Sequence, residues 1–299
     1  MKPFSHKLAF LFFLAVLTLP GVPTADAKDS KGYLFIIGGG RQPAEMTRRF
    51  IELAGGGSKS KIIVIPMASE SPAESGEFQV AEFNSHGATN VESLVLTHEE
   101  ATNRAAAARL DGATGVFFTG GDQSRLAALI VGSPVRQKLK ELYAHGAVMG
   151  GTSAGAAVMS KVMITGEELL NDDKTNAFKF IKRNNIQTVE GFGFLTNAVI
   201  DQHFIKRKRL NRLFSVVLEH PNLVGIGIDE STAIVMNPDD TFEVIGESAV
   251  MVIDPRKANG IRTDKSGNLS ARNIQTHILV AGDRFDLTSG KTIRQRNNP

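Results

Sequence analysis

Short apolar runs rich in β-branched residues alternate with longer amphipathic stretches through the first half of the chain. Such runs are typical of strands buried on both faces, whereas the stretches between them have helical periodicity. The predicted strands of this half cover residues 33–37, 61–65, 91–96, 115–118 and 147–149. Because helices regularly separate these strands, we expect an α/β fold with a mostly parallel central sheet and helices on both faces.

In the second half, the predicted strands follow one another with less chain between them. They cover residues 198–200, 224–228, 233–236, 242–245, 249–253 and 278–281. This spacing favours partly antiparallel pairing, and we expect these strands to be added to the same sheet. A basic helix is expected near residues 206–219, and the polar residues 254–273 are expected to form a loop. We find no repeat or linker, and therefore predict a single domain over residues 28–299.

The beginning of the chain has the pattern of a secretory signal. Lys2 and Lys7 precede an apolar run over residues 8–19, and Ala25 and Ala27 supply the small residues of a cleavage site. The alternative is a membrane anchor, but this run of 12 residues is shorter than the roughly 20 that span a bilayer. We expect residues 1–27 to be removed, and the mature protein to be secreted or periplasmic without membrane contact.

Composition excludes several kinds of chemistry. The 299 residues include no cysteine, which excludes thiol nucleophiles, cysteine-bound metals and disulfides. The formal net charge is only +3, so nothing indicates nucleic acid as a partner. The glycine runs at residues 38–40 and 55–57 do not complete a nucleotide-binding motif, and no metal-ligand spacing occurs. We therefore predict no cofactor, no metal and no sensitivity to chelators.

Gly151, Ser153 and Gly155 form a G-x-S-x-G pattern between the predicted strand at residues 147–149 and a predicted small-residue helix at residues 154–160. A sharp strand-to-helix turn holds a serine in a strained backbone conformation, for which flanking glycines leave room. The amino end of the helix offers N–H groups to a developing oxyanion. The pattern predicts a nucleophile at Ser153. The alternative is a glycine-rich turn whose serine caps the helix.

A serine nucleophile needs a neighbouring base. Beyond the predicted signal, His203 is the histidine that best fits this role. It follows the predicted strand at residues 198–200, at the carboxyl edge of the sheet where Ser153 should also lie. Surface positions, helix ends or a strand start explain the others, which are His86, His98, His145, His220 and His277.

The acid that orients the base should also follow a strand. Asp229 and Glu230 both follow the predicted strand at residues 224–228, and the pattern alone does not choose between them. Asp201 is too near His203 along the chain to orient it easily, but it could line the pocket. The resulting chain order of serine, histidine and acid differs from that of α/β-hydrolases, which indicates a different family.

Together these segments resemble the cyanophycinases, serine peptidases related to the aspartyl dipeptidase peptidase E. In chain order the matching segments are Gly38-Gly39-Gly40, Gly120-Gly121-Asp122-Gln123, Gly150 to Gly155, Asp201-Gln202-His203-Phe204 with Arg207, Arg209 and Arg212, and Gly227 to Ala233. The match covers nearly all of the predicted mature chain. The turn from Gly150 to Gly155, here called the elbow, and the glycine pair Gly120-Gly121 are shared with peptidase E. The segment around His203 is more particular to cyanophycinases.

The resemblance implies roles for individual residues. The nucleophile falls on Ser153, the base on His203 and the acid on Glu230, so that Asp229 is set aside. The implied oxyanion donors are the backbone N–H groups of Gly121 and Ala154. The implied substrate-groove residues are Gln123, Asp201, Gln202, Arg207, Arg209 and Arg212.

The resemblance also implies a substrate and a homodimer. Cyanophycin has an aspartate backbone whose side chains carry arginine, so each unit holds a guanidinium and a free carboxylate, which arginines and carboxylates of a protein can bind. Its hydrolysis through an acyl-enzyme would release β-Asp-Arg dipeptides. Two other functions stay open, an exported aspartyl or isoaspartyl dipeptidase with the same triad and a non-catalytic binding protein. The basic helix could equally be a solvated face.

Overall fold

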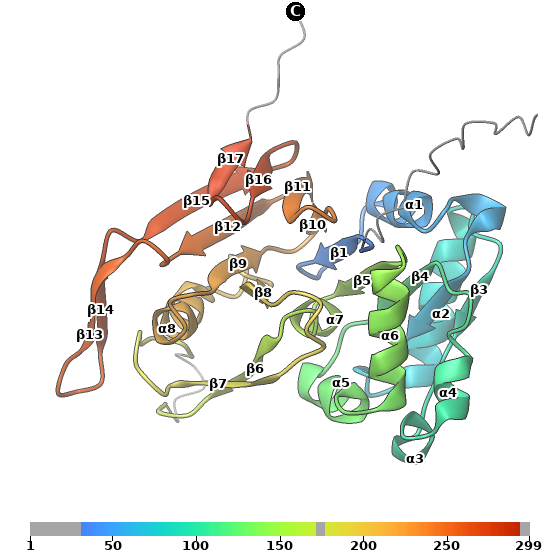
Figure 1. Cartoon of the computed structure of the whole chain (residues 1–299), viewed down its shortest axis with the longest axis horizontal. Coiled ribbons are helices and arrows are strands. Elements are labelled where there is room, and N and C mark those ends of the chain that lie inside the picture. The colour runs from blue at the N-terminus through green and yellow to red at the C-terminus, as the bar shows by residue number, and fades with distance from the viewer. Residues whose placement is uncertain (1–30, 172–176, 294–299) are drawn as a thin grey trace, which may run out of the picture.

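The structure is a computed structural model that describes residues 31–171 and 177–293. The predicted secretory signal lies outside the described residues and stays a prediction. Two large sheets of unequal size and two small two-stranded sheets, with helices packed around them, make up the described structure (Figure 1). Among the described residues, none of the helices combines the length and the apolar character that crossing a membrane requires.

The larger sheet has nine strands in the order β17-β16-β11-β10-β1-β5-β4-β2-β3 (Figure 1). Its parallel half consists of β1 (Leu34–Ile37), β5 (Val148–Thr152), β4 (Gly115–Phe118), β2 (Ile62–Ile65) and β3 (Val91–Ser93). Its antiparallel half consists of β10 (Thr232–Met236), β11 (Thr241–Gly246), β16 (Arg284–Asp286) and β17 (Lys291–Ile293). The parallel half corresponds to the strands predicted from the first half of the chain.

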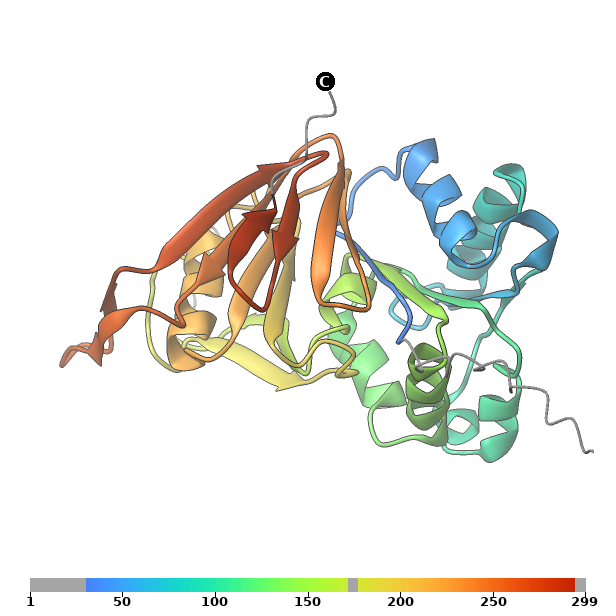
Figure 2. The ribbon, with the colours of Figure 1, turned by 45° about the horizontal axis from the view of Figure 1, so that its top comes forward.

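Helices cover both faces of the parallel half (Figure 2). On one face lie α1 (Ala44–Leu53) and α2 (Pro72–Ser85), and the short 3-10 helix η1 (Gly57–Lys59) lies in the connection from α1 to β2. There Phe50 and Phe83 pack against Phe117, with ring centroids 5.3 Å apart. On the other face lie α3 (His98–Ala101), α4 (Arg104–Ala108), α5 (Gln123–Ile130), α6 (Pro134–Ala144) and α7 (Ala154–Ala157). The predicted α/β fold is confirmed.

The expectation that all second-half strands join this sheet is wrong. A separate sheet of four strands has the order β15-β12-β9-β8, with bounds β15 (Gln275–Val280), β12 (Ala249–Asp254), β9 (Val224–Ile228) and β8 (Ala198–Gln202). Only residues 229–231 connect β9 to β10, and Ser231 has a φ of 52°, so a short kink takes the chain from one sheet to the other. The two sheets share one hydrophobic cluster, which includes Ile36 and Ile226.

The last helix, α8 (Leu210–Glu219), covers the other face of the smaller sheet. Its Leu213 and Val217 pack with Val199 of β8. The helix begins at Leu210 rather than near residue 206, because Lys208 has a left-handed φ of 52° that a helix cannot contain.

Polar strands account for most of the remaining differences from expectation. Residues 254–273 contain a hairpin of β13 (Asn259–Thr263) and β14 (Leu269–Arg272) instead of a loop, and β6 (Val162–Glu168) pairs with β7 (Ile186–Glu190). Most residues of β7, β13 and β14 are exposed or half-buried, so they show no apolar alternation by which sequence could identify them. The small-residue helix after the elbow is also shorter than expected, since α7 ends at Ala157.

Candidate active site

Ser153 lies in a sharp turn between β5 and α7. Its backbone angles are φ 53° and ψ −109°, and its N–H donates to the carbonyl of Ile37 at 3.0 Å. A Cβ at Gly151 would approach the carbonyl oxygen of Gly155 to 2.4 Å, and a Cβ at Gly155 would approach that of Phe118 to 2.1 Å. Glycines are therefore required on both sides, as in a nucleophile elbow. In the described structure the Ser153 side chain makes no capping hydrogen bond to α7, which removes the alternative of a serine cap.

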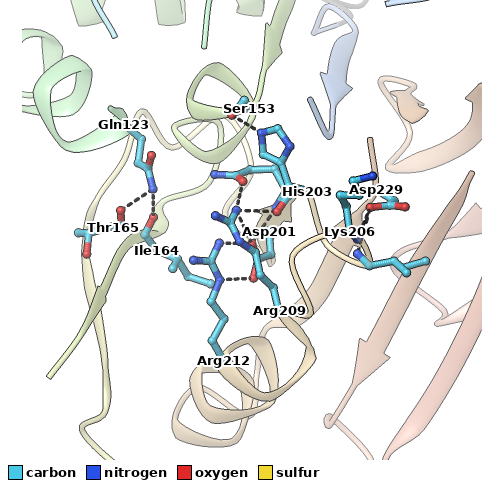
Figure 3. A network of polar contacts seen from close by, with 12 residues as sticks. Gln123, Ser153, Ile164, Thr165, Asp201, His203, Lys206, Arg209, Arg212 and Asp229 are labelled. Atoms are coloured by element: carbon cyan, nitrogen blue, oxygen red, sulfur yellow. Dashed lines mark hydrogen bonds and ion pairs between the residues drawn. The ribbon is translucent and has the colours of Figure 1, made fainter. Parts of the chain in front are cut away.

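His203 faces Ser153 from the end of β8 (Figure 3). Its Nε2 lies 2.8 Å from Ser153 Oγ. The backbone of His203 has a left-handed φ of 49°, and its N–H donates to the carbonyl of Gly38 at 2.7 Å. A Cβ at Gly39 would lie 2.3 Å from Cε1 of the imidazole. The loop after β1 therefore brings its backbone against the ring, and only glycine leaves room for the imidazole there.

Glu230 lies on the opposite side of the imidazole from Ser153. Its Oε1 is 2.7 Å from His203 Nδ1. The carboxylate accepts a hydrogen bond from Nδ1–H, which leaves Nε2 as an acceptor for the Ser153 hydroxyl. This is the tautomer that a general base needs before it removes a proton from serine. The hydroxyl, the imidazole and the carboxylate thus form one continuous hydrogen-bonded chain.

The neighbouring acid, Asp229, has other partners. Its Oδ1 accepts the backbone N–H groups of Ile205 and Lys206 at 3.1 and 2.9 Å, and its Oδ2 accepts the hydroxyl of Ser248 at 2.8 Å. Both oxygens are therefore engaged away from the imidazole. The structure distinguishes two acids that are adjacent in sequence, and places Glu230 rather than Asp229 on His203.

The surroundings of His203 favour its neutral form. Burial lowers the pKa of the imidazole, and the charges of Arg207 and Arg209 lower it further, whereas the hydrogen bond and charge of Glu230 raise it. The net result is a pKa below the ordinary value of about 6.5. A neutral imidazole at neutral pH is the state that can accept a proton from Ser153.

The predicted oxyanion donors lie on two turns beside Ser153. A Cβ at Gly120 would be 3.5 Å from Ser153 Cβ, so the turn after β4 lies against the serine. Gly121 in this turn has a φ of 137°, and a Cβ there would approach the carbonyl oxygen of Ala68 to 2.1 Å. Ala154 is the first residue of α7, so its N–H has no acceptor within the helix. The role of both N–H groups stays a prediction.

Behind His203 lies a buried network of charges (Figure 3). Asp201 and Arg212 are each only 1% exposed, and two nitrogens of the Arg212 guanidinium bind the two carboxylate oxygens, with Nε at 2.7 Å from Oδ2. The guanidinium also lies over the ring of Phe178, 4.9 Å from its centroid. Arg209 donates to the backbone carbonyl of Gln202 at 2.7 Å and to its side-chain oxygen.

This network contains more positive charge than the acid within it can balance. Asp201 is bonded to Arg212 and lies 3.9 Å from Arg209. Within the part of the chain that the structure describes, Nε of Arg209 and Nη1 of Arg212 are buried and have no hydrogen-bond partner. Burial lowers the pKa of Arg209 to about 10, so the group remains a cation at neutral pH. A carboxylate bound at the exposed edge of this network would be attracted by its excess of positive charge.

The other two predicted groove residues have different environments. The Gln123 side chain donates to the carbonyls of Ile164 and Thr165 in β6, at 3.0 and 2.5 Å, and is thereby held against that strand. Arg207 is exposed, and its backbone N–H donates to the carbonyl of His203 at 2.9 Å. The contact of β6 with Gln123 could not be predicted from the sequence, because backbone carbonyls make it and every residue has one. Sequence reasoning also missed Phe178, which lies in a short segment where apolar residues alternate with lysines and no functional pattern is visible.

No set of three or more histidine, aspartate or glutamate side chains within the described residues is arranged to hold a metal ion. The residues that surround Ser153 are instead those of a proton-transfer chain and of a buried basic network.

Comparisons with known proteins agree with this geometry. The family model described as peptidase family S51 matches residues 34–245. A protein named cyanophycinase from Trichormus variabilis is 35% identical over 266 residues, which cover 86% of each chain. The cyanophycinase of Thermosynechococcus vestitus is 35% identical over 265 residues, covering 86% of this chain and 80% of the other. That of Geminocystis herdmanii is 33% identical over 261 residues.

Solved structures show the same fold. A peptidase from an acI-B1 actinobacterium superposes with a TM-score of 0.64 and 25% identity, covering 87% of this chain and 98% of the other. A putative peptidase E protein from Listeria monocytogenes superposes with a TM-score of 0.50 over 73% of this chain and 100% of the other. At 16% identity, the second likeness concerns the fold alone.

Proposed function

The chain belongs to peptidase family S51 and is a peptidase, and from this premise we propose that it hydrolyses cyanophycin to β-Asp-Arg dipeptides with Ser153 as nucleophile. One observation carries the chemistry, the hydrogen-bonded chain in which His203 lies 2.8 Å from Ser153 and 2.7 Å from Glu230. The names of the relatives support the substrate, since each is called a cyanophycinase and matches at least 85% of this chain.

The proposed reaction begins when Ser153 Oγ attacks a carbonyl carbon of the aspartate backbone. His203 Nε2 takes the hydroxyl proton, and Glu230 stabilises the imidazolium that forms. The N–H groups of Gly121 and Ala154 bind the developing oxyanion, and removal of one such donor costs about 3–4 kcal/mol of transition-state stabilisation. The tetrahedral intermediate collapses as His203 gives its proton to the leaving amine. Water then hydrolyses the acyl-enzyme by the same proton transfers in reverse.

The basic network behind His203 supports a substrate with carboxylates. Every unit of cyanophycin carries the free carboxylate of its arginine, and the cationic side chain of Arg209, although its Nε is buried, is partly exposed beside His203. We assign the carboxylate contact to Arg209 and to the exposed Arg207. The pair of Asp201 with Arg212 is too buried to reach the polymer, and it holds Arg209 and Gln202 in place from behind.

Product analysis tests the substrate proposal. Purified protein is incubated separately with insoluble cyanophycin and with short Asp-X and isoaspartyl peptides, and the products are identified by mass spectrometry. We expect the polymer to dissolve and β-Asp-Arg to accumulate. Turnover of the short peptides alone would replace this proposal by an aspartyl dipeptidase. Failure of a serine-directed phosphonate to label the protein would indicate a non-catalytic binding protein.

Export is a second part of the proposal. The basic start, the apolar run and the small residues before Lys28 support removal of residues 1–27. Amino-terminal sequencing of the protein from the periplasm and the culture medium is expected to begin at Lys28. Full-length chain recovered only from the cytoplasm would contradict export without affecting the proposed reaction.

A further inference from the structure

Asp229 connects two parts of the active site without touching the imidazole. It is 7% exposed, and its side chain accepts three hydrogen bonds. Two come from the backbone N–H groups of Ile205 and Lys206, in the turn directly after His203, and the third comes from the hydroxyl of Ser248, in the connection between β11 and β12. Figure 3 shows Asp229 beside Lys206. Asp229 itself immediately precedes Glu230.

The turn that carries His203 depends on acceptors from other segments. His203 and Lys208 both have left-handed backbones, so no regular element supports this turn. The N–H of His203 donates to the carbonyl of Gly38, and that of Phe204 donates to the carbonyl of Ile228 at 3.2 Å. The next two N–H groups of the turn have the Oδ1 of Asp229 as their acceptor. The carboxylate thus acts as a helix cap would, but from another strand.

The other oxygen of Asp229 leads to the backbone of Glu230. Oδ2 accepts a hydrogen bond from the Ser248 hydroxyl. The backbone N–H of Ser248 donates to the Thr232 hydroxyl at 2.9 Å. That hydroxyl in turn donates to the carbonyl of Glu230 at 3.1 Å. A closed path of hydrogen bonds therefore joins the turn of His203 to the strand end that carries its acid.

We propose that Asp229 is a positioning residue that fixes the turn of His203 relative to Glu230, and thereby sets the distance between the imidazole and the catalytic carboxylate. This inference rests on the proposed function. A misplacement of about 1 Å at a reacting group can cost about 100-fold in rate. Asp229 reaches the turn of His203 only through the backbone N–H groups of Ile205 and Lys206, so its negative charge should matter less than the hydrogen bonds that it makes.

Two substitutions of Asp229 separate this role from that of a charged group. Asp229→Asn keeps an oxygen for Ile205 and Lys206 and can donate its amide to Ser248, so kcat/KM should stay within a few-fold of wild type. Asp229→Ala leaves two N–H groups and a hydroxyl without an acceptor, and kcat/KM should fall by about 100-fold with little change in KM. Glu230→Gln should cost more than either substitution, by about 10⁴-fold.

The pH profile distinguishes positioning from a structural role. The charged groups that face His203 are Glu230, whose hydrogen bond and charge raise its pKa, and Arg207 and Arg209, which lower it. When the contact with Glu230 loosens, the pKa of His203 should fall further. The acid limb of kcat/KM should then shift to lower pH in Asp229→Ala. A merely structural role would reduce the amount of folded enzyme and leave this limb unmoved.

The test uses the mature enzyme, with kcat and KM for cyanophycin measured across pH and the downfield proton NMR signal of His203 Nδ1–H recorded for each variant. Asp264→Ala is the matched control, because Asp264 accepts two backbone N–H groups at 2.8 Å in the distant turn between β13 and β14. For that control we expect the pH profile of kcat/KM and the Nδ1–H signal to be those of the wild type. An unshifted signal and an unmoved acid limb in Asp229→Ala would overturn the proposal.

Two further measurements keep the test decisive. If Asp229→Ala does not fold, Ser248→Ala removes one hydrogen bond of the path. We then expect a smaller loss of kcat/KM, with the acid limb of its pH profile shifted in the same direction. In a Glu230→Ala background the loss from Asp229→Ala should nearly vanish, whereas an equal loss in both backgrounds would contradict positioning. An inactive wild type would refute the proposed function alone, because the Nδ1–H signal needs no substrate and still decides the role of Asp229.

Discussion

At the scale of single residues, the candidate site consists of groups whose ordinary chemistry is changed by their neighbours. A serine hydroxyl is a weak nucleophile, and Ser153 gains a base only because a left-handed backbone turns the imidazole of His203 toward it. Strained backbone angles occur at both residues, with φ of 53° and 49°. Such strain persists where the surrounding structure enforces it, and here two strand ends and two glycine turns do so.

Ser153→Ala should abolish hydrolysis while leaving the fold intact. The hydroxyl makes no capping bond within the described structure, so its loss should change the melting temperature little. Loss of the nucleophile should lower kcat by about 10⁶-fold. Ser85→Ala is the control, because the Ser85 hydroxyl makes a local contact on the surface of α2. Activity near wild type in Ser153→Ala would remove this residue from the mechanism.

The pH dependence should follow the lowered pKa of His203. The base must be neutral, so kcat/KM should rise through a limb that lies below the ordinary pKa of about 6.5. The same shift has a consequence for stability. The unfolded imidazole binds its proton more tightly than the folded one, so this group's contribution is present above about pH 6.5 and is lost as pH falls through the folded pKa. Urea unfolding of wild type and His203→Gln at several pH values measures this contribution of His203 to the free energy of unfolding.

At the scale of elements, backbone segments without functional side chains decide where the reacting groups lie. The glycine loop after β1 touches both the base and the acid. A Cβ at Gly39 would lie 2.3 Å from the imidazole, and one at Gly40 would lie 2.8 Å from Glu230 Cβ. The N–H of Ser231 also donates to the carbonyl of Gly39 at 2.8 Å. The loop therefore serves as the surface against which the two residues are aligned.

Gly39→Ala should displace the imidazole and reduce kcat/KM by about 100-fold or more. Gly56→Ala is a closely matched control. Gly56 also has a positive φ, of 78°, but a Cβ there would meet nothing within 4 Å. Both substitutions should destabilise the fold by about 1 kcal/mol or more through backbone strain, but only the first should affect hydrolysis. Equal effects of the two on kcat/KM would contradict a specific contact with His203.

Helix α8 is tied to β8 by a buried ion pair. Arg212→Ala would leave the Asp201 carboxylate without its bidentate partner in a site that is 1% exposed. Removing one member of such a pair costs about 3–5 kcal/mol, which denaturant unfolding would detect. Arg49→Ala, which removes an exposed pair with Glu52, should cost less than about 1 kcal/mol. Similar costs for both variants would mean that Asp201 finds another partner.

At the scale of the whole molecule, the site lies where two sheets meet. The serine follows a strand of the larger sheet, whereas the base and the acid follow strands of the smaller one. Packing between the sheets therefore enters directly into the geometry of catalysis. The shared hydrophobic cluster stabilises that packing, and it includes Ile36 and Met149 of the larger sheet with Ile226 and Ile228 of the smaller one.

Hydrolysis should not require a metal ion. The proposed proton transfers use only Ser153, His203 and Glu230, and no described side-chain cluster is suited to a metal. Dialysis against EDTA should leave kcat/KM for cyanophycin unchanged, and later addition of Mg²⁺ or Zn²⁺ should not increase it. A loss of activity that a metal restores would show that the mechanism lacks a component.

Several features followed from local sequence because their causes are local. The parallel half of the large sheet is visible as short apolar runs, since strands covered on both faces must be apolar throughout. The elbow is visible as Gly151, Ser153 and Gly155, since a strained turn needs glycines at fixed positions. The peptidase family could be identified from such segments, and the matches to family S51 and to cyanophycinases confirm that identification. The roles of individual residues stay predictions.

Other features were decided only by tertiary structure, because they depend on which distant groups meet. Strands β9 and β10 have similar apolar sequences, and their assignment to different sheets comes from pairing with β8 and β1. Asp229 and Glu230 are adjacent acids, and the kink between the sheets turns one toward a backbone turn and the other toward the imidazole. Local sequence specifies which residue types are present, whereas hydrogen bonds between distant segments determine what each residue contacts.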